Sequence, residues 1–443
     1  MAIDTSLPVW RFEPDWSNDV TETLEWLTDV LTSPIGAEQR RALRFFPRQY
    51  LEFDVVAAGR ERTLLDNLLN TYGGGTWYLP LWFDPHALTA FVLAAGSTVV
   101  PLANVADSEL EVGKAAFIYS GDVFDFELVE IAAIGANSVT LTAPTTKVWR
   151  IGAILYPARK ARAVEQPSLP RRSDTVVSFS IKFRVDESPD DDDSYTTSLE
   201  LPWLTDTYLQ HSILDLPPNE VETLDTSLVR LLEELDNRTS RPVVVDTAGR
   251  EFEAQQYRWL LQGRAQHRGF KALLKALRGR AMPLWVPTFF TDFELAEAVV
   301  SGDSVLTVSL AGFTEAGSAR PGRRHIMIRL ADGTNFYREI VNSAAGSTTE
   351  VLALDQPLLR DIQPFEVQQI SFISFVRLNQ DAIEIAHRTD IEGVSDISMV
   401  FRSLIEPAFG DIPFGYFALT SKTGSITLTN KTGTKILLGK MPS

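Results

Sequence analysis

The sequence of 443 residues contains no cysteine. This absence excludes disulfide scaffolds, thiolate zinc sites, iron–sulfur clusters and cysteine nucleophiles. Basic residues are also outnumbered: 41 lysines and arginines face 58 aspartates and glutamates, for a formal net charge of −17. A general nucleic-acid-binding protein needs a basic surface, so we expect no sequence-specific nucleic-acid partner. The basic run of Arg40, Arg41, Arg44 and Arg48 is a local exception.

Long apolar runs are absent as well. No uncharged apolar stretch approaches the roughly 20 residues that a membrane-spanning helix requires. The first residues, Met1-Ala2-Ile3-Asp4-Thr5, lack the basic and apolar regions of a signal peptide. We therefore expect a soluble protein without a membrane partner.

Histidines are few, and no two of them are spaced at i+2 or i+4 as in a zinc site. We expect isolated polar or surface side chains at His86, His211, His267, His325 and His387. The segment from Gly433 to Met441 resembles a phosphate-binding loop only superficially, because it has one residue too many between its glycines and methionine in place of serine or threonine. Gly302-Asp303-Ser304 lacks the surroundings of a serine nucleophile, so we expect a hairpin turn there.

Three glutamates in predicted strands, Glu127, Glu130 and Glu339, are the remaining candidates for acid–base chemistry. A glycosidase would need two such carboxylates across one sugar. Glu130 and Glu339 instead occupy equivalent positions of a repeat described below, which favours a structural role such as pairing with an arginine. We expect no catalytic residue, no cofactor and no metal site.

An internal duplication is the most informative feature that the sequence does contain. Landmarks recur 207 residues apart: Leu24–Asp29 with Leu231–Asp236, Gln49-Tyr50 with Gln256-Tyr257, and Pro80 with Pro287. Further along, the spacing drifts upward as loop insertions would cause. The later pairs are Gly113 with Gly322, Glu130 with Glu339, Gly135 with Gly346, Pro144 with Pro357, and Phe183-Arg184 with Phe401-Arg402.

Each half follows one plan. It opens with a region whose apolar residues Val20, Leu24, Trp26 and Val30 fit both a strand and a helix. A short amphipathic helix comes next. Its apolar positions are Leu64, Leu65, Leu68 and Leu69 before Gly73-Gly74-Gly75 in the first half, and Phe270, Leu273, Leu274 and Leu277 before Gly279 in the second.

A small β module and a closing strand complete each half. In the first half we expect strands over 97–102, 115–119, 126–131, 138–141 and 176–185. In the second half we expect them over 304–309, 325–330, 336–341, 349–354 and 397–404, with a hairpin turn at Asp332-Gly333. The fold class is therefore mainly β with a few short helices, built from β-sandwich or β-barrel modules.

Between the helix and the β module lies an aromatic–proline strand in each half. Its aromatic residues are Trp77, Tyr78, Trp82 and Phe83, and then Trp285, Phe289 and Phe290. They could form an exposed platform that stacks on sugars, but their place directly after the apolar helix favours packing. Two segments lie outside the plan: the acidic run over 186–193, expected to be a solvated loop, and the tail over 414–443, expected to be a terminal hairpin or arm.

Short motifs resemble those of bacteriophage proteins. Residues 25–30, 36–44 and 47–48 resemble the opening of tail-tip proteins of long-tailed phages, in which a G-x-E-Q-R-x-A-L-R-x-x-P-R run leads into a strand. Gly279-Arg280, Pro283, Trp285 and Pro287 are similar to a strand of distal tail and baseplate hub proteins. Val139-Thr140-Leu141-Thr142-Ala143-Pro144 is similar to the end of small β domains appended to such proteins.

The resemblance implies a structural component of a phage tail tip or baseplate, in the virion, assembled in the cytoplasm of the host bacterium. Such a component forms a ring that joins the tail tube to the distal tip and the receptor-binding proteins. Its partners would be the tail tube protein, other baseplate or tail-tip proteins, and copies of itself in a homo-trimer or homo-hexamer. A duplicated module would let three chains present six quasi-equivalent surfaces to a sixfold tube.

Two other functions stay open from the sequence: a carbohydrate-binding host-recognition protein of the tail, and a tail-associated cell-wall hydrolase. The first predicts that Trp82 or Trp285 is exposed, and the second predicts an essential glutamate such as Glu130.

The expected domains follow the duplication. They are a first tail-tip core domain (1–90 plus 159–187), its inserted β module (91–158), a second core domain (188–292 plus 372–406), its inserted β module (293–371), and a C-terminal β arm (407–443). Each half should then hold its own core, so we expect a cut in the acidic run to leave two folded fragments.

Overall fold

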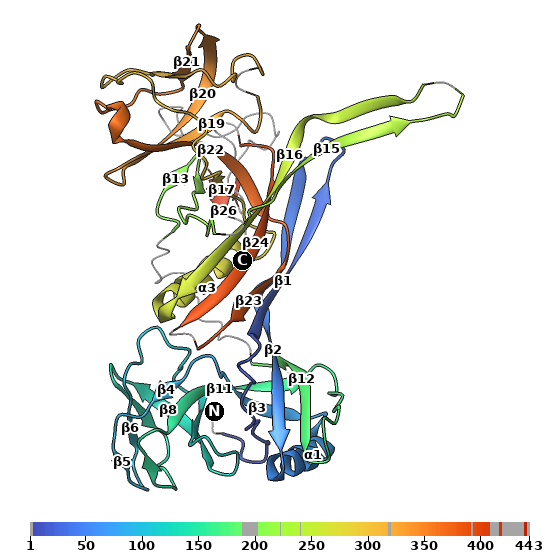
Figure 1. The fold of residues 1–443 in the computed structure, drawn as a ribbon, viewed down its shortest axis with the longest axis vertical. Coiled ribbons are helices and arrows are strands. Elements are labelled where there is room, and N and C mark those ends of the chain that lie inside the picture. Colours follow the sequence, from blue (N-terminus) through green and yellow to red (C-terminus); the bar gives the residue numbers. More distant parts are fainter. Residues whose placement is uncertain are drawn as a thin grey trace.

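The computed structural model describes residues 3–187, 203–221, 223–239, 241–317, 320–390, 393–407, 416–418 and 438–440. Strands make up 49% of the chain, and the described part has two α-helices. Twenty strands are joined in one hydrogen-bonded network, and the pairings between its strands are antiparallel (Figure 1). The prediction of a mainly β fold with few helices is confirmed. No helix in the described ranges is long and apolar enough to cross a membrane.

The first half of the chain forms one helix and a series of strands. They are β1 (Val20–Thr32), β2 (Glu38–Ala58), α1 (Arg60–Tyr72), β3 (Thr76–Pro80), β4 (His86–Ala87), β5 (Val92–Leu93), β6 (Val99–Pro101), β7 (Ala115–Tyr119), β8 (Phe126–Ile134), β9 (Ser138–Leu141), β10 (Trp149–Arg150), β11 (Ile154–Ala163) and β12 (Val176–Val185).

The second half also contains helices and a series of strands. Its elements are β13 (Thr207–Tyr208), β14 (His211–Ser212), β15 (Thr226–Leu235), β16 (Val243–Gln262), α3 (Gly263–Leu277), β17 (Leu284–Pro287), β18 (Val305–Ser309), β19 (His325–Leu330), β20 (Asn335–Ala345), β21 (Thr349–Leu354), the 3-10 helix η1 (Pro364–Glu366), β22 (Val367–Leu378), β23 (Ala382–His387) and β24 (Val394–Ser403). Two short strands of the tail, β25 (Tyr416–Ala418) and β26 (Leu438–Lys440), pair with each other.

The region from Val20 to Val30, which the apolar pattern left open, is the strand β1. Both predicted helices are confirmed, and glycines mark their starts. Gly59 precedes α1 and Gly263 opens α3, each with a positive φ, of 56° and 75°. A long strand turns sharply into a helix at these points, and glycine adopts such a φ without steric cost. Helix α3 ends at a left-handed Arg278, followed by Gly279.

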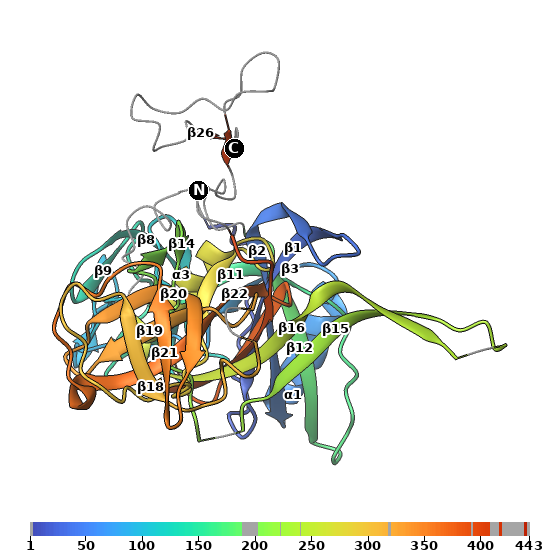
Figure 2. The ribbon, with the colours of Figure 1, turned by 90° about the horizontal axis from the view of Figure 1, so that it is seen from above.

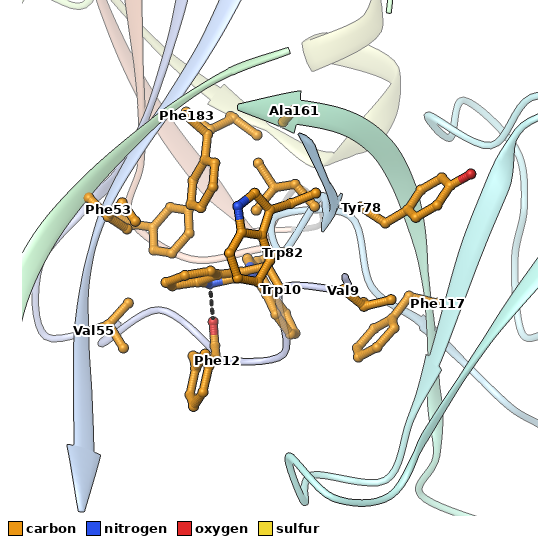
Figure 3. Close-up of a cluster of buried hydrophobic side chains, with 14 of the residues drawn as sticks. Val9, Trp10, Phe12, Phe53, Val55, Tyr78, Trp82, Phe117, Ala161 and Phe183 are labelled. Carbon is orange, nitrogen blue, oxygen red and sulfur yellow. Dashed lines mark hydrogen bonds between the residues drawn. The ribbon is translucent and has the colours of Figure 1, made fainter. Parts of the chain in front are cut away.

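The aromatic–proline strand lies in the core of the first half (Figure 3). Trp10 packs edge-to-face on Trp77 and Phe183, with ring centroids 5.8 and 5.0 Å apart. Trp82 packs on Tyr156 in the same way, at 4.9 Å. Separate apolar cores fill the two β modules, one formed by residues between Leu88 and Leu155 and the other by residues between Phe293 and Phe372.

The two halves are interlocked by the strand β1. It pairs with β2 along its length and with β23 of the second half from Val20–His387 to Glu25–Ala382. Leu24 and Trp26 of β1 pack in the core of the second half. This shared core argues against the expectation of two independently folding halves, because a cut would separate that core from part of its own residues. We now expect one cooperative unit.

Candidate functional site

Two β-hairpins, β1–β2 and β15–β16, extend beyond the packed modules, and β15–β16 projects farther from the rest of the chain (Figures 1 and 2). Strand β15 pairs along its whole length with β16, from Thr226–Gln255 to Leu235–Val243. Among the described residues, its other edge pairs with no strand, and residues 243–253 of β16 pair only with β15. The outer part of this hairpin is therefore a two-stranded ribbon with open edges.

Apolar side chains cover this ribbon although water reaches both of its faces. The exposed ones are Leu228, Val229, Leu232, Leu235, Val243, Val244 and Val245. Leu235 is 64% exposed and Val244 is 55% exposed. Isolated two-stranded hairpins are marginally stable in water, and open apolar edges invite pairing with another chain. The composition of this ribbon is typical of a surface that a partner covers.

The β1–β2 hairpin has the same character on a smaller scale. Its exposed apolar residues are Leu27, Leu31, Ile35, Leu43, Phe45 and Phe46. Its tip lies against the β15–β16 hairpin, since the Thr247 hydroxyl donates to the Pro34 carbonyl oxygen at 2.8 Å. Gly36, with φ of 84°, lies directly against the Phe252 ring, where a Cβ atom would clash.

The Glu-Gln-Arg run holds this hairpin against the second half. Glu38 forms a buried bidentate ion pair with Arg377 of β22, with oxygen–nitrogen distances of 2.6 and 2.8 Å. Arg44 pairs with Glu25 at 3.3 Å, and burial lowers the pKa of Arg40 to about 10. Arg40 and Arg44 of the basic run are thus engaged within the protein, whereas Arg41 and Arg48 are exposed.

A buried polar cluster, hereafter the junction, lies where β1, α3, β23 and β24 meet. Its members are Glu22, His267, Lys271, His387 and Ser395. The Ser395 hydroxyl lies 2.6 Å from Nε2 of His267 and 2.8 Å from Nδ1 of His387. Nε2 of His387 lies 3.1 Å from Oε2 of Glu22. Lys271 donates to Oε1 of Glu22 at 2.9 Å.

Residues of the first half surround this cluster. Phe83 stacks on the His387 ring with a centroid distance of 4.4 Å, and Glu109 accepts from Lys271 at 2.7 Å. Gln49 of β2 donates to Glu22 at 2.7 Å. Close by, Arg264 donates from Nε to the buried Asp84 at 2.9 Å. The junction therefore ties the two halves together through charges and hydrogen bonds as well as through the shared sheet.

Burial and neighbouring charges act in opposite directions on the pKa values of this cluster. Burial by itself raises the pKa of Glu22, but Lys271 and His387 lower it to about 2. Burial lowers the pKa of Lys271, but Glu109 and Glu22 raise it above its usual range. Burial lowers the pKa of His267 to about 4. Burial lowers the pKa of His387, although the hydrogen bond and charge of Glu22 act in the opposite direction. Glu22 and Lys271 are therefore both ionised at neutral pH.

The order Ser395–His387–Glu22 matches the connectivity of a nucleophile, a base and an orienting acid. All three residues have an exposed fraction of 0%, however, and Phe83 covers the imidazole face. The Ser395 hydroxyl also contacts a second histidine, His267. A substrate has no route to this hydroxyl in the folded chain, so the arrangement supports a structural role.

A cleft of about 940 Å³ lies beside the junction, with Glu22 and Lys271 on its wall. Its other walls come from residues 43–49 of β2, the loop 107–112, the end of β12 and the outer face of α3. Charges of both signs line it, and Arg159 pairs there with Glu111 at 2.7 Å. The buried cluster therefore borders this cleft through Glu22 and Lys271.

The prediction of isolated polar or surface histidines was wrong. His86, His267, His325 and His387 are buried, and two of them meet through Ser395. The sequence pattern could not predict this cluster, because its members lie far apart in the chain. His267 is 128 positions from Ser395, and His387 is 365 positions from Glu22. One signal was present, since Glu22 shares a face of β1 with buried apolar residues, where a charge needs a partner.

The remaining candidate residues are engaged in local structure. Glu127 accepts from Thr146 and, at 2.9 Å, from the Trp149 indole, and Glu339 pairs with Arg324 at 3.0 Å. Glu130 and Glu339 belong to different β modules.

The aromatic residues of the platform are mostly buried. Trp82 is 3% and Trp285 0% exposed, so neither can form a sugar platform, although Phe290 is 60% exposed. Gly302-Asp303-Ser304 is a turn before β18, as expected.

Other predictions fall mainly outside the described residues: most of the acidic run and most of the segment from Gly433 to Met441. In the ranges that the structure describes, no three histidine, cysteine, aspartate or glutamate side chains are placed to hold a metal ion. No family model matches the sequence, and no curated protein matches it significantly.

Proposed function

We propose that this chain is a structural subunit of the tail tip of a long-tailed bacteriophage, where copies form a ring that joins the tail tube to the distal tip. The observation that carries the proposal is the β15–β16 ribbon, which exposes seven apolar side chains and an unpaired strand edge within the described chain. A second copy of the chain is the occupant that we infer. Two hairpins of one kind in each chain provide the repeated, directional contacts that a closed ring requires.

An internal duplication is part of this proposal, and matched details of the two β modules support it. Glu130 faces Ala115 across β8 and β7, and Glu339 faces His325 across β20 and β19. The carbonyl oxygens of these glutamates accept from Thr142 and from Asp355, each at 2.9 Å.

The strand irregularities also coincide. A bulge follows Ile131 in the pairing of β8 with β9, and another follows Ile340 in the pairing of β20 with β21. Bulges are inherited features of a fold more often than accidents, so matched bulges favour a common origin.

The register of the long strands refines the predicted spacing. Phe183 pairs with Leu51, and Phe401 pairs with Gln255. If the two phenylalanines are equivalent, the strands β2 and β16 align 204 residues apart, as do Gly59 and Gly263, instead of the 207 that Tyr50 and Tyr257 indicated. Three copies of such a chain would present six related units, whereas six copies would present twelve.

The test is the molar mass of the purified full chain by size exclusion with light scattering, at increasing concentration. We expect a trimer or hexamer, and we expect Val244→Asp to dissociate it, because a charge would be buried at the inter-chain contact. Val300→Asp is the matched control, since Val300 is 61% exposed but lies in a β module away from the ribbon. A monomer at every concentration, or equal effects of both substitutions, would contradict the proposal.

A further inference from the structure

The hydrogen bonds of the junction form one continuous chain between two acceptors. At one end, Nδ1 of His267 lies 2.7 Å from the carbonyl oxygen of Gly263, which can only accept. At the other end, Nε2 of His387 lies 3.1 Å from the Glu22 carboxylate. The Ser395 hydroxyl links the two imidazoles at 2.6 and 2.8 Å. Each of these four contacts needs one hydrogen.

The groups in their ordinary neutral forms cannot supply four hydrogens. A neutral imidazole carries one N–H, and a serine hydroxyl carries one O–H, so two histidines and one serine supply three. If His267 donates to Gly263, its Nε2 must accept from Ser395. Ser395 must then accept from Nδ1 of His387, and His387 has no second hydrogen for Glu22. Reversing the direction only moves the missing hydrogen to the Gly263 end.

Neighbouring groups decide where the additional proton lies. Glu22 already accepts from Lys271 and Gln49 on Oε1, which favours its ionised form. His267 needs no second proton when its Nδ1 donates to Gly263 and its Nε2 accepts. Of the two imidazoles, His387 is the one that lies directly against the negative Glu22, and its protonated ring would face two acceptors. Burial opposes this charge and lowers the pKa of His387, but a neutral ring would leave one of the four contacts without a hydrogen.

We propose that the junction is a proton-binding site, in which His387 is held as an imidazolium between Glu22 and Ser395 in the folded chain. The other charged groups facing this ring are Lys271 from α3 and Glu109 from the loop that precedes β7. Glu22 and Lys271 line the cleft described above, and we infer that this wall is the route of proton exchange with solvent.

This proton links the two halves of the molecule. Glu22 lies on β1 and His387 on β23, and β1 continues outward into the β1–β2 hairpin. Loss of the proton would leave two acceptors facing each other in a buried site, which is costly. The junction thus holds β1, the strand that continues into the β1–β2 hairpin, in a pH-dependent manner. This inference holds whether or not the chain forms a ring.

The sign of the pH dependence distinguishes the proposal from its opposite. A histidine that stays protonated in the folded chain stabilises it below the ordinary pKa of about 6.5 and loses that effect as the pH rises through its folded-state pKa. A histidine kept neutral by burial alone would instead weaken the fold as the pH falls below about 6.5. Because the chain has no cysteine, few other groups titrate between pH 6 and 9.

The experiment is urea unfolding of the full chain between pH 6 and 9, compared with Glu22→Gln. The amide that this substitution introduces can supply the missing hydrogen to a neutral His387. We expect the unfolding constant of the unmodified chain to rise with pH, by up to about tenfold per pH unit for one proton, and the variant to lose that rise. His211→Gln, at a partly exposed histidine outside the junction, should keep it. Equal slopes for the unmodified chain and Glu22→Gln would overturn the proposal.

A second measurement does not depend on a variant that folds. In the chain labelled with ¹⁵N at histidine, the proposal expects one imidazole at pH 8 with both ring nitrogens protonated. If every histidine shows one protonated and one unprotonated ring nitrogen at pH 8, the proposal is wrong.

Discussion

At the junction, the charged and polar side chains of Glu22, His387 and Ser395 are fully buried, whereas on the β15–β16 ribbon the apolar Leu235 and Val244 are exposed. Both regions depart from the usual partition of side chains between core and surface. In the junction, each polar group finds a partner elsewhere in the same chain. On the ribbon, the apolar groups have no comparable cover. One interface is thus already formed within the chain, and the exposed apolar side chains of the other support the proposal that a second molecule covers it.

We expect Lys271→Met to destabilise the internal interface the most. This change leaves Glu22 and Glu109 facing each other without their shared cation, so we expect the free energy of unfolding to fall by about 3–5 kcal/mol. Urea unfolding measures it. Lys182→Met is the matched control: its ion pair with Glu52 is 41% exposed on the lysine side, and its loss should cost less than about 1 kcal/mol. Equal losses for the two variants would count against a special role of the junction.

Trp26→Ala tests whether the two halves share one core. Trp26 lies on a strand of the first half but is buried among residues of the second. We expect a loss of about 3–5 kcal/mol and a single unfolding transition by calorimetry. Two separate transitions, only one of them shifted, would show that the halves are independent after all. Trp16→Ala, at a residue that is 37% exposed, should change the stability by less than about 0.5 kcal/mol.

Ser395→Ala tests whether the hydrogen-bond chain stabilises the junction. The substitution leaves ring nitrogens of His267 and His387 without a buried partner, for an expected loss of about 1–3 kcal/mol. Ser398→Ala provides the comparison, since that hydroxyl accepts from Gln256 at an exposed site. If both substitutions have the same small effect in urea unfolding, the junction is not held by this chain of bonds.

We expect a substitution on the β15–β16 ribbon to have the smallest effect on stability. Val244→Asp should change the unfolding free energy of the dissociated chain by less than about 0.5 kcal/mol, because Val244 contacts mainly water within one molecule. The measurement is urea unfolding at a concentration where the chain is monomeric. A large loss in the monomer would mean that the ribbon is stabilised from within, and the contrast between the two regions would fail.

Local patterns predicted both helices and the main strands of the β modules, but not long strands such as β11, β16 and β22. The strands β7, β9, β12, β19 and β21 have the bounds that alternation and turn residues predicted, and α3 ends beside Gly279. These elements depend on neighbours in the sequence. The spacing of the apolar residues from Val20 to Val30 could not distinguish a strand from a helix. This region is a strand because β1 pairs with β23, more than 350 residues away in the sequence. Short-range periodicity contains no information about such a partner.

The candidate sites were less predictable. The apolar runs that form the ribbon are visible in the sequence at Val243-Val244-Val245, but their exposure is not, since a run of valines is equally typical of a buried strand. The junction combines Glu22, Lys271 and His387, which only the tertiary fold brings together. Each departs from its local apolar surroundings, and that was the only sign available.

The most direct test of the assembly claim is single-particle cryo-EM of the purified chain. The account predicts a closed ring of three or six copies in which Leu232, Leu235 and Val244 of each β15–β16 ribbon are covered by the neighbouring copy. A ring held together by other surfaces, with these side chains still exposed to solvent, would contradict it.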